Sequence, residues 1–157
     1  MLAIYGRPDT WNWLLLFHIL SAVLVFAGAI VVMAASLAAL RTAAADRALL
    51  LRRVALITGL LTIPPYIGIH IFGGLLADRE FPKGVDEPGW LGAGFGLTDL
   101  YGIISIILLS LLQWRAVRRA RAGDMLGWQA KLATWLSPIG PVLLLIALFL
   151  MSAKPGQ

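Results

Sequence analysis

The stretch Leu14–Leu40, LLLFHILSAVLVFAGAIVVMAASLAAL, decides the fold. It contains no Asp, Glu, Lys or Arg, and its one ionisable side chain is that of His18. A helix of about 20 apolar residues, rising about 1.5 Å per residue, crosses the hydrocarbon core of a bilayer. The stretch is therefore long enough to form a transmembrane helix.

Three further apolar runs follow. Val54–Ala77 is interrupted by His70, Trp90–Trp114 by Asp99, and Leu132–Ala153 by no ionisable residue. In lipid a helix satisfies its own backbone polar groups, which an open strand cannot do. The sequence predicts an all-α, polytopic membrane protein with four transmembrane helices, at about residues 11–40, 50–77, 90–115 and 131–153, in one transmembrane domain that spans residues 1–157.

Composition narrows the function classes. Hydrophobic residues make up 60% of the 157 residues and charged residues only 13%, whereas a soluble domain is about a quarter charged. There is no cysteine, which excludes disulfides, thiolate metal sites and cysteine nucleophiles. Neither a Gly-x-Ser-x-Gly nor a His-Glu-x-x-His motif occurs, so hydrolytic catalysis is not expected.

Basic residues predict the orientation. They gather in the two loops that follow the first and third runs, and the positive-inside rule places such loops in the cytoplasm. The expected topology is two helical hairpins with both termini outside (N-out/C-out). The arginines expected to contact anionic lipid are Arg41, Arg47, Arg52, Arg53, Arg115, Arg118, Arg119 and Arg121. No aromatic residues are interleaved with them on a soluble domain, so no nucleic-acid partner is expected.

His18, His70 and Asp99 are the candidate site. An ionisable residue inside a membrane is costly and is read by default as functional. Counted from the nearest interfacial residue, these three lie seven, eight and nine residues inside their runs, or roughly 10–14 Å below the outer surface. Each also falls on a face of small residues at helical spacing, such as Gly92 and Gly96 beside Asp99. We expect the three side chains to lie together.

Several chemistries fit such a cluster. His18 and His70 on different helices are suitable ligands for the two faces of haem b. With Asp99 they make a two-histidine, one-carboxylate metal site for copper or zinc. A His–Asp pair also suits proton binding and release. The structural alternative is that all three residues only hold helices together through hydrogen bonds.

Paired prolines mark the second and fourth runs. Pro64-Pro65 and Pro138 with Pro141 remove helical N–H groups and free carbonyls one turn earlier, which predicts kinks. Thr62 and Ser137 are placed to hydrogen-bond the freed groups. Ordinary kinks are the favoured interpretation, and a hinge or an ion pathway is the alternative.

Residues 16–23, LFHILSAV, followed by Gly28, resemble the first helix of small four-helix bacterial membrane proteins of unknown function. Those proteins are themselves similar to the membrane part of copper-resistance D (CopD-like) proteins. Trp90 with Ala93-Gly94-Phe95 is similar to the third-helix entry of that family. The resemblance implies a prokaryotic plasma (inner) membrane location and leaves open a role near copper or redox traffic. Only His18 matches a position of the family motif.

The sequence thus favours a small integral membrane protein or subunit without catalytic activity. Its His18/His70/Asp99 cluster is expected to bind haem b or a metal ion, or to bind and release protons. The alternative is a purely structural subunit of a larger membrane complex, with other membrane subunits as partners and no cofactor of its own.

Overall fold

The computed structural model describes residues 9–42, 44–82, 88–122 and 128–153. All regular secondary structure in these ranges is helical. Four continuous helical stretches in them are long and apolar enough to cross a membrane, Trp11–Arg41, Leu49–Glu80, Gly89–Arg119 and Trp128–Ala153. The all-α fold with four membrane-length helices is therefore confirmed, close to the expected bounds.

Three of the four spans are interrupted. The elements are α1 (Asp9–Arg41), α2 (Ala44–Ile57), η1 (Thr58–Thr62), α3 (Ile63–Glu80), α4 (Gly89–Tyr101), η2 (Gly102–Leu108), α5 (Leu109–Arg121), α6 (Trp128–Leu136) and α7 (Ile139–Ala153). Here η1 and η2 are π-helical segments, whose backbone hydrogen bonds reach one residue further than those of an α-helix. Span one is α1, span two α2–η1–α3, span three α4–η2–α5, and span four α6–α7.

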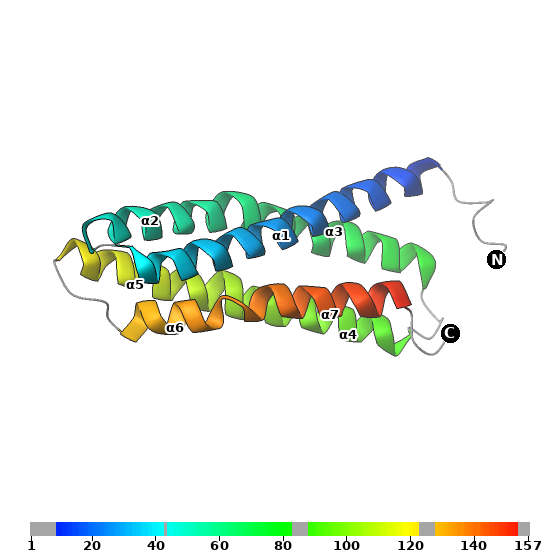
Figure 1. Ribbon diagram of the computed structural model, residues 1–157. Helices are drawn as coiled ribbons and strands as arrows, with labels where there is room; N and C mark the ends of the chain where they lie inside the picture. The colour runs from blue at the N-terminus through cyan, green and yellow to red at the C-terminus, as the bar shows by residue number, and fades with distance from the viewer. Residues whose placement is uncertain (1–8, 43, 83–87, 123–127, 154–157) are drawn as a thin grey trace.

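The helices form an elongated bundle with two distinct ends (Figure 1). At the end called here the terminal end, α1 begins, α3 ends, α4 begins and α7 ends. At the opposite end, called the basic end, α1 meets α2 and α5 lies near α6. Arg41, Arg52, Arg53, Arg115 and Arg119 lie in the helical segments nearest that end and are exposed.

The paired prolines coincide with two interruptions. Pro64 and Pro65 lie in the first turn of α3, one residue after the end of η1, and because proline has no N–H, the preceding turn loses its regular bonds. In span four, α6 ends at Leu136 and α7 begins at Ile139. There the Ser137 hydroxyl donates to the carbonyl of Thr134 over 2.8 Å. The regular α-helix is therefore interrupted near both sets of prolines, and η2 adds a third interruption without a proline.

Polarity is distributed as expected when lipid is the solvent. Large apolar side chains point outward, with Leu60, Trp135 and Phe149 exposed by 72%, 79% and 66%. Small polar side chains are buried at the bundle centre, among them Ser36, Thr58, Thr62, Ser105, Gln113, Thr134 and Ser137. A soluble protein shows the reverse pattern. The arrangement fits a bundle whose outer surface faces a membrane.

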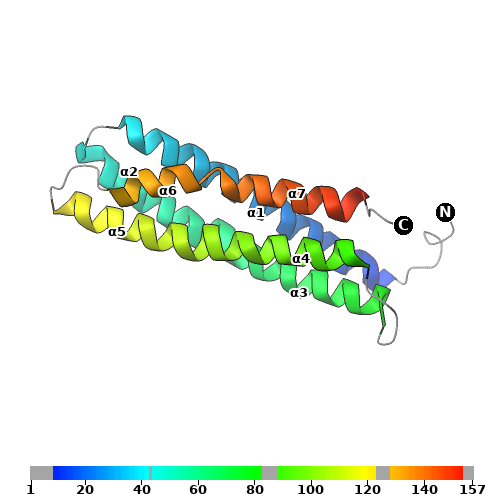
Figure 2. The same ribbon diagram turned by 90° about the horizontal axis from the view of Figure 1, so that it is seen from below.

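The spans pack in pairs at the terminal end. α1 lies along α3, and α4 lies along α7, as both views show (Figures 1 and 2). Glycines allow these approaches, because a Cβ on Gly68 would meet Ser21, and one on Gly94 would meet Met151. The backbones of α3 and α4 hardly approach each other. Side chains therefore form the α3–α4 interface, and the candidate site is among them.

Candidate functional site

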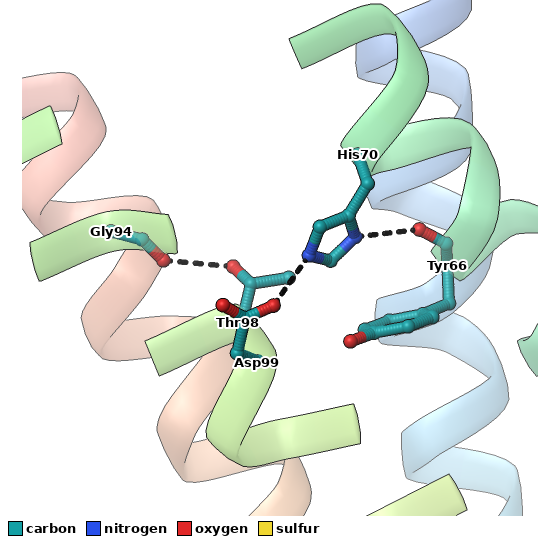
Figure 3. Close-up of polar contacts among 5 residues, drawn as sticks. All are labelled: Tyr66, His70, Gly94, Thr98 and Asp99. Carbon is teal, nitrogen blue, oxygen red and sulfur yellow. Dashed lines mark hydrogen bonds and ion pairs between the residues drawn. The ribbon is translucent and has the colours of Figure 1, made fainter. Parts of the chain in front are cut away.

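His70 and Asp99 meet across the α3–α4 interface (Figure 3). The Nε2 atom of His70 lies 2.8 Å from Oδ1 of Asp99. The Nδ1 atom of His70 lies 3.1 Å from the backbone carbonyl oxygen of Tyr66, one helical turn earlier on α3. Both ring nitrogens of His70 are thus engaged by the protein itself. This contact joins spans two and three where their backbones stand apart.

Aromatic rings flank the imidazole of His70. The Tyr66 ring is 4.5 Å away between centroids and tilted by 53°. The Phe95 ring of α4 lies 6.3 Å away on a 54° tilt. The imidazole thus packs beside one aromatic ring from its own helix and one from α4, while its Nε2 atom points at α4.

Asp99 is displaced from the buried face of its helix. The buried face of α4 carries Gly94, Thr98 and Tyr101, and Asp99 follows Thr98 by one residue, about 100° around the helix. Thr98 hydrogen-bonds its own helix, donating to the carbonyl of Gly94 over 2.9 Å (Figure 3). The Asp99 side chain is 60% exposed and that of His70 is 30% exposed. The pair therefore lies at the surface of the bundle and not in its interior.

The hydrogen bonds determine how many protons the pair holds. A carbonyl oxygen only accepts, so His70 donates from Nδ1–H to Tyr66. The remaining bond, from Nε2 to Oδ1, needs one proton between two atoms that otherwise both accept. That proton gives either an imidazolium beside a carboxylate or a neutral imidazole beside a carboxylic acid. The bonded pair has no net charge in both cases.

His18 occupies a different interface. Its ring lies against α3, where a Cβ on Gly73 would be 3.0 Å from its Cε1 atom and 3.2 Å from its Nδ1 atom. Gly73 is about one turn from His70, on the terminal side. The Nδ1 atom of His18 is buried and has no hydrogen-bond partner among the described residues. His18 packs at the α1–α3 interface, while His70 points to α4.

The three predicted residues are thus only partly brought together. His70 and Asp99 are bonded, which agrees with the expectation that they face each other. Across residues 9–42, 44–82, 88–122 and 128–153, no group of three His, Asp or Glu side chains is placed to hold a metal ion. His18 is near in depth but is directed at the backbone of α3.

The small-residue face of α4 also differs from the expectation. A Cβ added to Gly92 or Gly96 would meet no atom within 4 Å, and both glycines are exposed. The predicted close packing at these glycines is absent from the described part of the chain. The buried face of α4 lies about two residues further along the sequence, at Gly94 and Thr98.

Tyr66 and Phe95 are not among the site residues that the sequence predicts. The Tyr66 carbonyl hydrogen-bonds His70, and its hydroxyl lies against Gly102 of span three. The sequence spacing could have indicated Tyr66, because it precedes His70 by four residues and so lies on the same helix face. Phe95 has no comparable spacing to His70, which lies on another helix.

Comparison with known proteins adds no further constraint. No protein-family model, curated protein or solved structure matches this chain. The similarity of residues 16–23 and 90–95 to CopD-like proteins stays a prediction. The contacts among His70, Asp99, Tyr66 and Phe95 define the candidate site as a hydrogen-bonded histidine–carboxylate pair at a helix interface.

Proposed function

We propose that this chain is a multi-pass membrane protein that binds and releases one proton at the His70–Asp99 pair. One observation carries the proposal. The 2.8 Å bond from Nε2 to Oδ1 requires a shared proton, because Nδ1 of His70 is already committed to the Tyr66 carbonyl. Loss of that proton leaves one negative charge at the surface of an apolar bundle and only one ring proton for the two bonds of His70, so one of those bonds is lost.

The proton also controls a helix contact. The backbones of α3 and α4 hardly approach each other, so the side-chain bond is a large part of what joins them at this level. A charged, unpaired carboxylate in a membrane is strongly disfavoured, and it draws water or a counter-charge toward α4. Proton release is therefore expected to loosen the α3–α4 interface, and proton binding to close it.

We infer a topology of two hairpins with both termini outside and the basic end in the cytoplasm of a prokaryotic cell. Support comes from the exposed arginines at the basic end and from the positive-inside rule. The Arg118 guanidinium lies 4.8 Å from the centre of the Trp114 ring, a pairing typical of the membrane interface. We propose anionic lipid as the partner of this basic end. Arg47 and Arg121 belong to the predicted lipid-contacting set, but their side chains lie outside the described residues.

Haem b or a metal ion would compete with Asp99 for the Nε2 atom of His70. The Nε2 atom of His70 would have to leave Asp99 to bind iron, copper or zinc, and His18 would have to leave Gly73. Visible spectra of the oxidised and reduced protein, with elemental analysis of the same sample, test this directly. A Soret band, or copper or zinc in stoichiometric amount, would overturn the proton proposal in favour of a cofactor at His18 and His70.

A structural subunit is the second candidate. It is favoured by the open surface of α4, where Gly92 and Gly96 have no neighbour within 4 Å and Asp99 is 60% exposed. Glycines at this spacing suit the close approach of another membrane helix. In that case the His70–Asp99 bond is a fixed contact that does not depend on pH in the physiological range.

Distance measurements between spin labels distinguish the two candidates. The chain has no cysteine, so Leu75→Cys on α3 and Ala93→Cys on α4, both exposed positions, can be labelled in pairs. As pH rises, the proton proposal predicts a longer and broader distance between these labels. The pair Ala93→Cys and Ser152→Cys, across the close α4–α7 contact, serves as the control and is expected to stay unchanged.

Two variants at position 99 sharpen the test. Asp99→Asn carries an amide N–H that donates to Nε2 without any shared proton, so α3 and α4 are expected to stay close at every pH. Asp99→Ala has no donor or acceptor, and the interface is expected to be loose at every pH. A native protein whose distance does not respond to pH would refute the proton proposal and leave the structural one.

A further inference from the structure

Three helix interruptions meet near the middle of the bundle. They are η1 in span two, η2 in span three, and the break between α6 and α7 in span four. Each contributes a hydroxyl to the same place, namely Thr62 from η1, Ser105 from η2 and Ser137 from the break. Interruptions of this kind leave backbone groups with irregular hydrogen bonding. The interior at this level is polar because it contains both hydroxyl side chains and backbone groups of interrupted helices.

A small cavity lies among these hydroxyls. About 10 Å³ of it is open to the centre of a water molecule, which is about the space that one water occupies. Its polar lining comes from Thr58, Thr62, Tyr101, Ser105 and Ser137, and apolar side chains of the neighbouring helices complete the wall. No Asp, Glu, Lys, Arg or His is in that lining.

The hydroxyls fall into two groups when their hydrogen bonds are counted. Thr58 donates to the carbonyl of Val54 over 2.9 Å, and Ser137 donates to that of Thr134 over 2.8 Å. The Ser105 hydroxyl, on a side chain 7% exposed, has no hydrogen-bond partner within the described ranges. The Thr62 hydroxyl, on a side chain 1% exposed, has the Tyr101 hydroxyl beside it but no hydrogen bond of good geometry in the described ranges. Leaving a buried hydroxyl unsatisfied costs about 1–3 kcal/mol, so a small hydrogen-bonding ligand in the cavity would stabilise both groups.

We propose that this cavity is a binding site for one water molecule, held by the hydroxyls of Thr62 and Ser105. A water donates twice and accepts twice, so it can satisfy both hydroxyls and still reach the free lone pairs of Thr58 or Ser137. A cation does not fit, since an ion buried without a carboxylate partner is strongly disfavoured. The ligand chemistry is neutral and hydrogen-bonding.

The water would link the same two spans as the proton-sharing pair. Thr62 belongs to span two and Ser105 to span three. They follow His70 and Asp99 toward the basic end, eight residues earlier and six residues later in the sequence. Spans two and three would then have a direct bridge at His70–Asp99, between α3 and α4, and a water-mediated bridge at mid-bundle, between η1 and η2. This water site does not depend on proton release by the pair.

Radiolytic hydroxyl-radical footprinting of the detergent-purified protein tests for the water. Radicals formed from a bound water oxidise the side chains beside it, even when bulk solvent cannot reach them. Leu109 lines the cavity and is 1% exposed, whereas Leu112, three residues later on α5, is 5% exposed and does not line it. The expected result is several-fold more oxidation at Leu109 than at Leu112, against the order of their exposure.

Variants show whether the two hydroxyls hold the water. Thr62→Val together with Ser105→Ala is expected to lower oxidation of Leu109 to the level of Leu112. Thr98→Val is the matched control, because Thr98 is equally buried but already donates to Gly94, and it should leave Leu109 oxidation unchanged.

Three outcomes would overturn the proposal. Equal oxidation of the two leucines in the native protein would do so without any variant, which protects the test if the double variant fails to fold. Oxidation of Leu109 that persists in the folded double variant would mean that other groups hold the water. Loss of Leu109 oxidation on adding sodium would indicate a cation in place of water.

Discussion

The surroundings of His18 and His70 differ although the two residues look alike in sequence. Each interrupts an apolar run with small residues nearby, and their helices pack against each other. His18 is set against Gly73 with a buried Nδ1 atom that has no partner in the described part of the chain. His70 has bonds at both ring nitrogens.

The difference lies in the interface that each ring meets. The α1–α3 interface is closed by glycines, which let the backbones approach and leave His18 in a packed site. The α3–α4 interface has little backbone contact, so side chains such as His70 and Asp99 bridge it. The His18 ring fills space at the closed interface and has a backbone hydrogen bond to Ile69 of α3, whereas His70 joins two helices at the open interface through its side-chain bond to Asp99.

The largest effect is expected at the closed interface. Gly73→Leu places a side chain where even a Cβ would lie 3.0 Å from the His18 ring, and overpacking of this kind costs about 1–3 kcal/mol. Gly74→Leu is the matched control, because a Cβ there meets nothing within 4 Å. The free energy of unfolding in detergent measures both. Equal losses in the two variants would show that His18 is not tightly packed against Gly73.

A smaller effect is expected at the open interface. Asp99→Ala removes the bond to His70, and a hydrogen bond between membrane helices contributes about 0.6–2 kcal/mol. Because the pair holds both hydrogen bonds of His70 only with its shared proton, the contribution of this contact is expected to fall as the proton leaves. The difference in unfolding free energy between native protein and variant should therefore shrink with rising pH. A difference that is constant across pH would argue for a bond without a releasable proton.

The smallest effect is expected for His18→Phe. The variant keeps a flat ring against Gly73 and removes a buried Nδ1 atom that has no described partner. It also loses the backbone hydrogen bond to Ile69, so unfolding free energy should fall by no more than about 1 kcal/mol. His70→Phe loses two hydrogen bonds and should destabilise clearly more. If His18→Phe proves the more damaging of the two, the roles assigned to the two histidines are reversed.

Much of the fold could be predicted because the bilayer constrains it so strongly. Four apolar runs of sufficient length predict four helices, and the positions of Pro64-Pro65 and Pro138 predict two of the interruptions. The choice of His70 and Asp99 followed from the rarity of ionisable groups in such runs. Thr62 and Ser137 were recognised as partners for freed backbone groups, but not as the lining of a shared cavity.

The face of span three could not be predicted, for a physical reason. The π-helical segment η2 (Gly102–Leu108) turns the helix by a different angle per residue than an α-helix does. A face drawn with α-helical spacing through Gly92, Gly96 and Asp99 therefore cannot be continued past that segment. These three residues are exposed, whereas Gln113, beyond η2, is buried.

The sequence by itself determined the class of protein, its four membrane-length helices and the few ionisable groups within them, because length and hydropathy act locally along the chain. The tertiary structure decided which of those groups meet. His70 reaches Asp99 and His18 reaches Gly73 because glycine positions and π-helical segments set how closely each pair of helices packs. Those distances depend on residues far apart in sequence, and no local pattern records them.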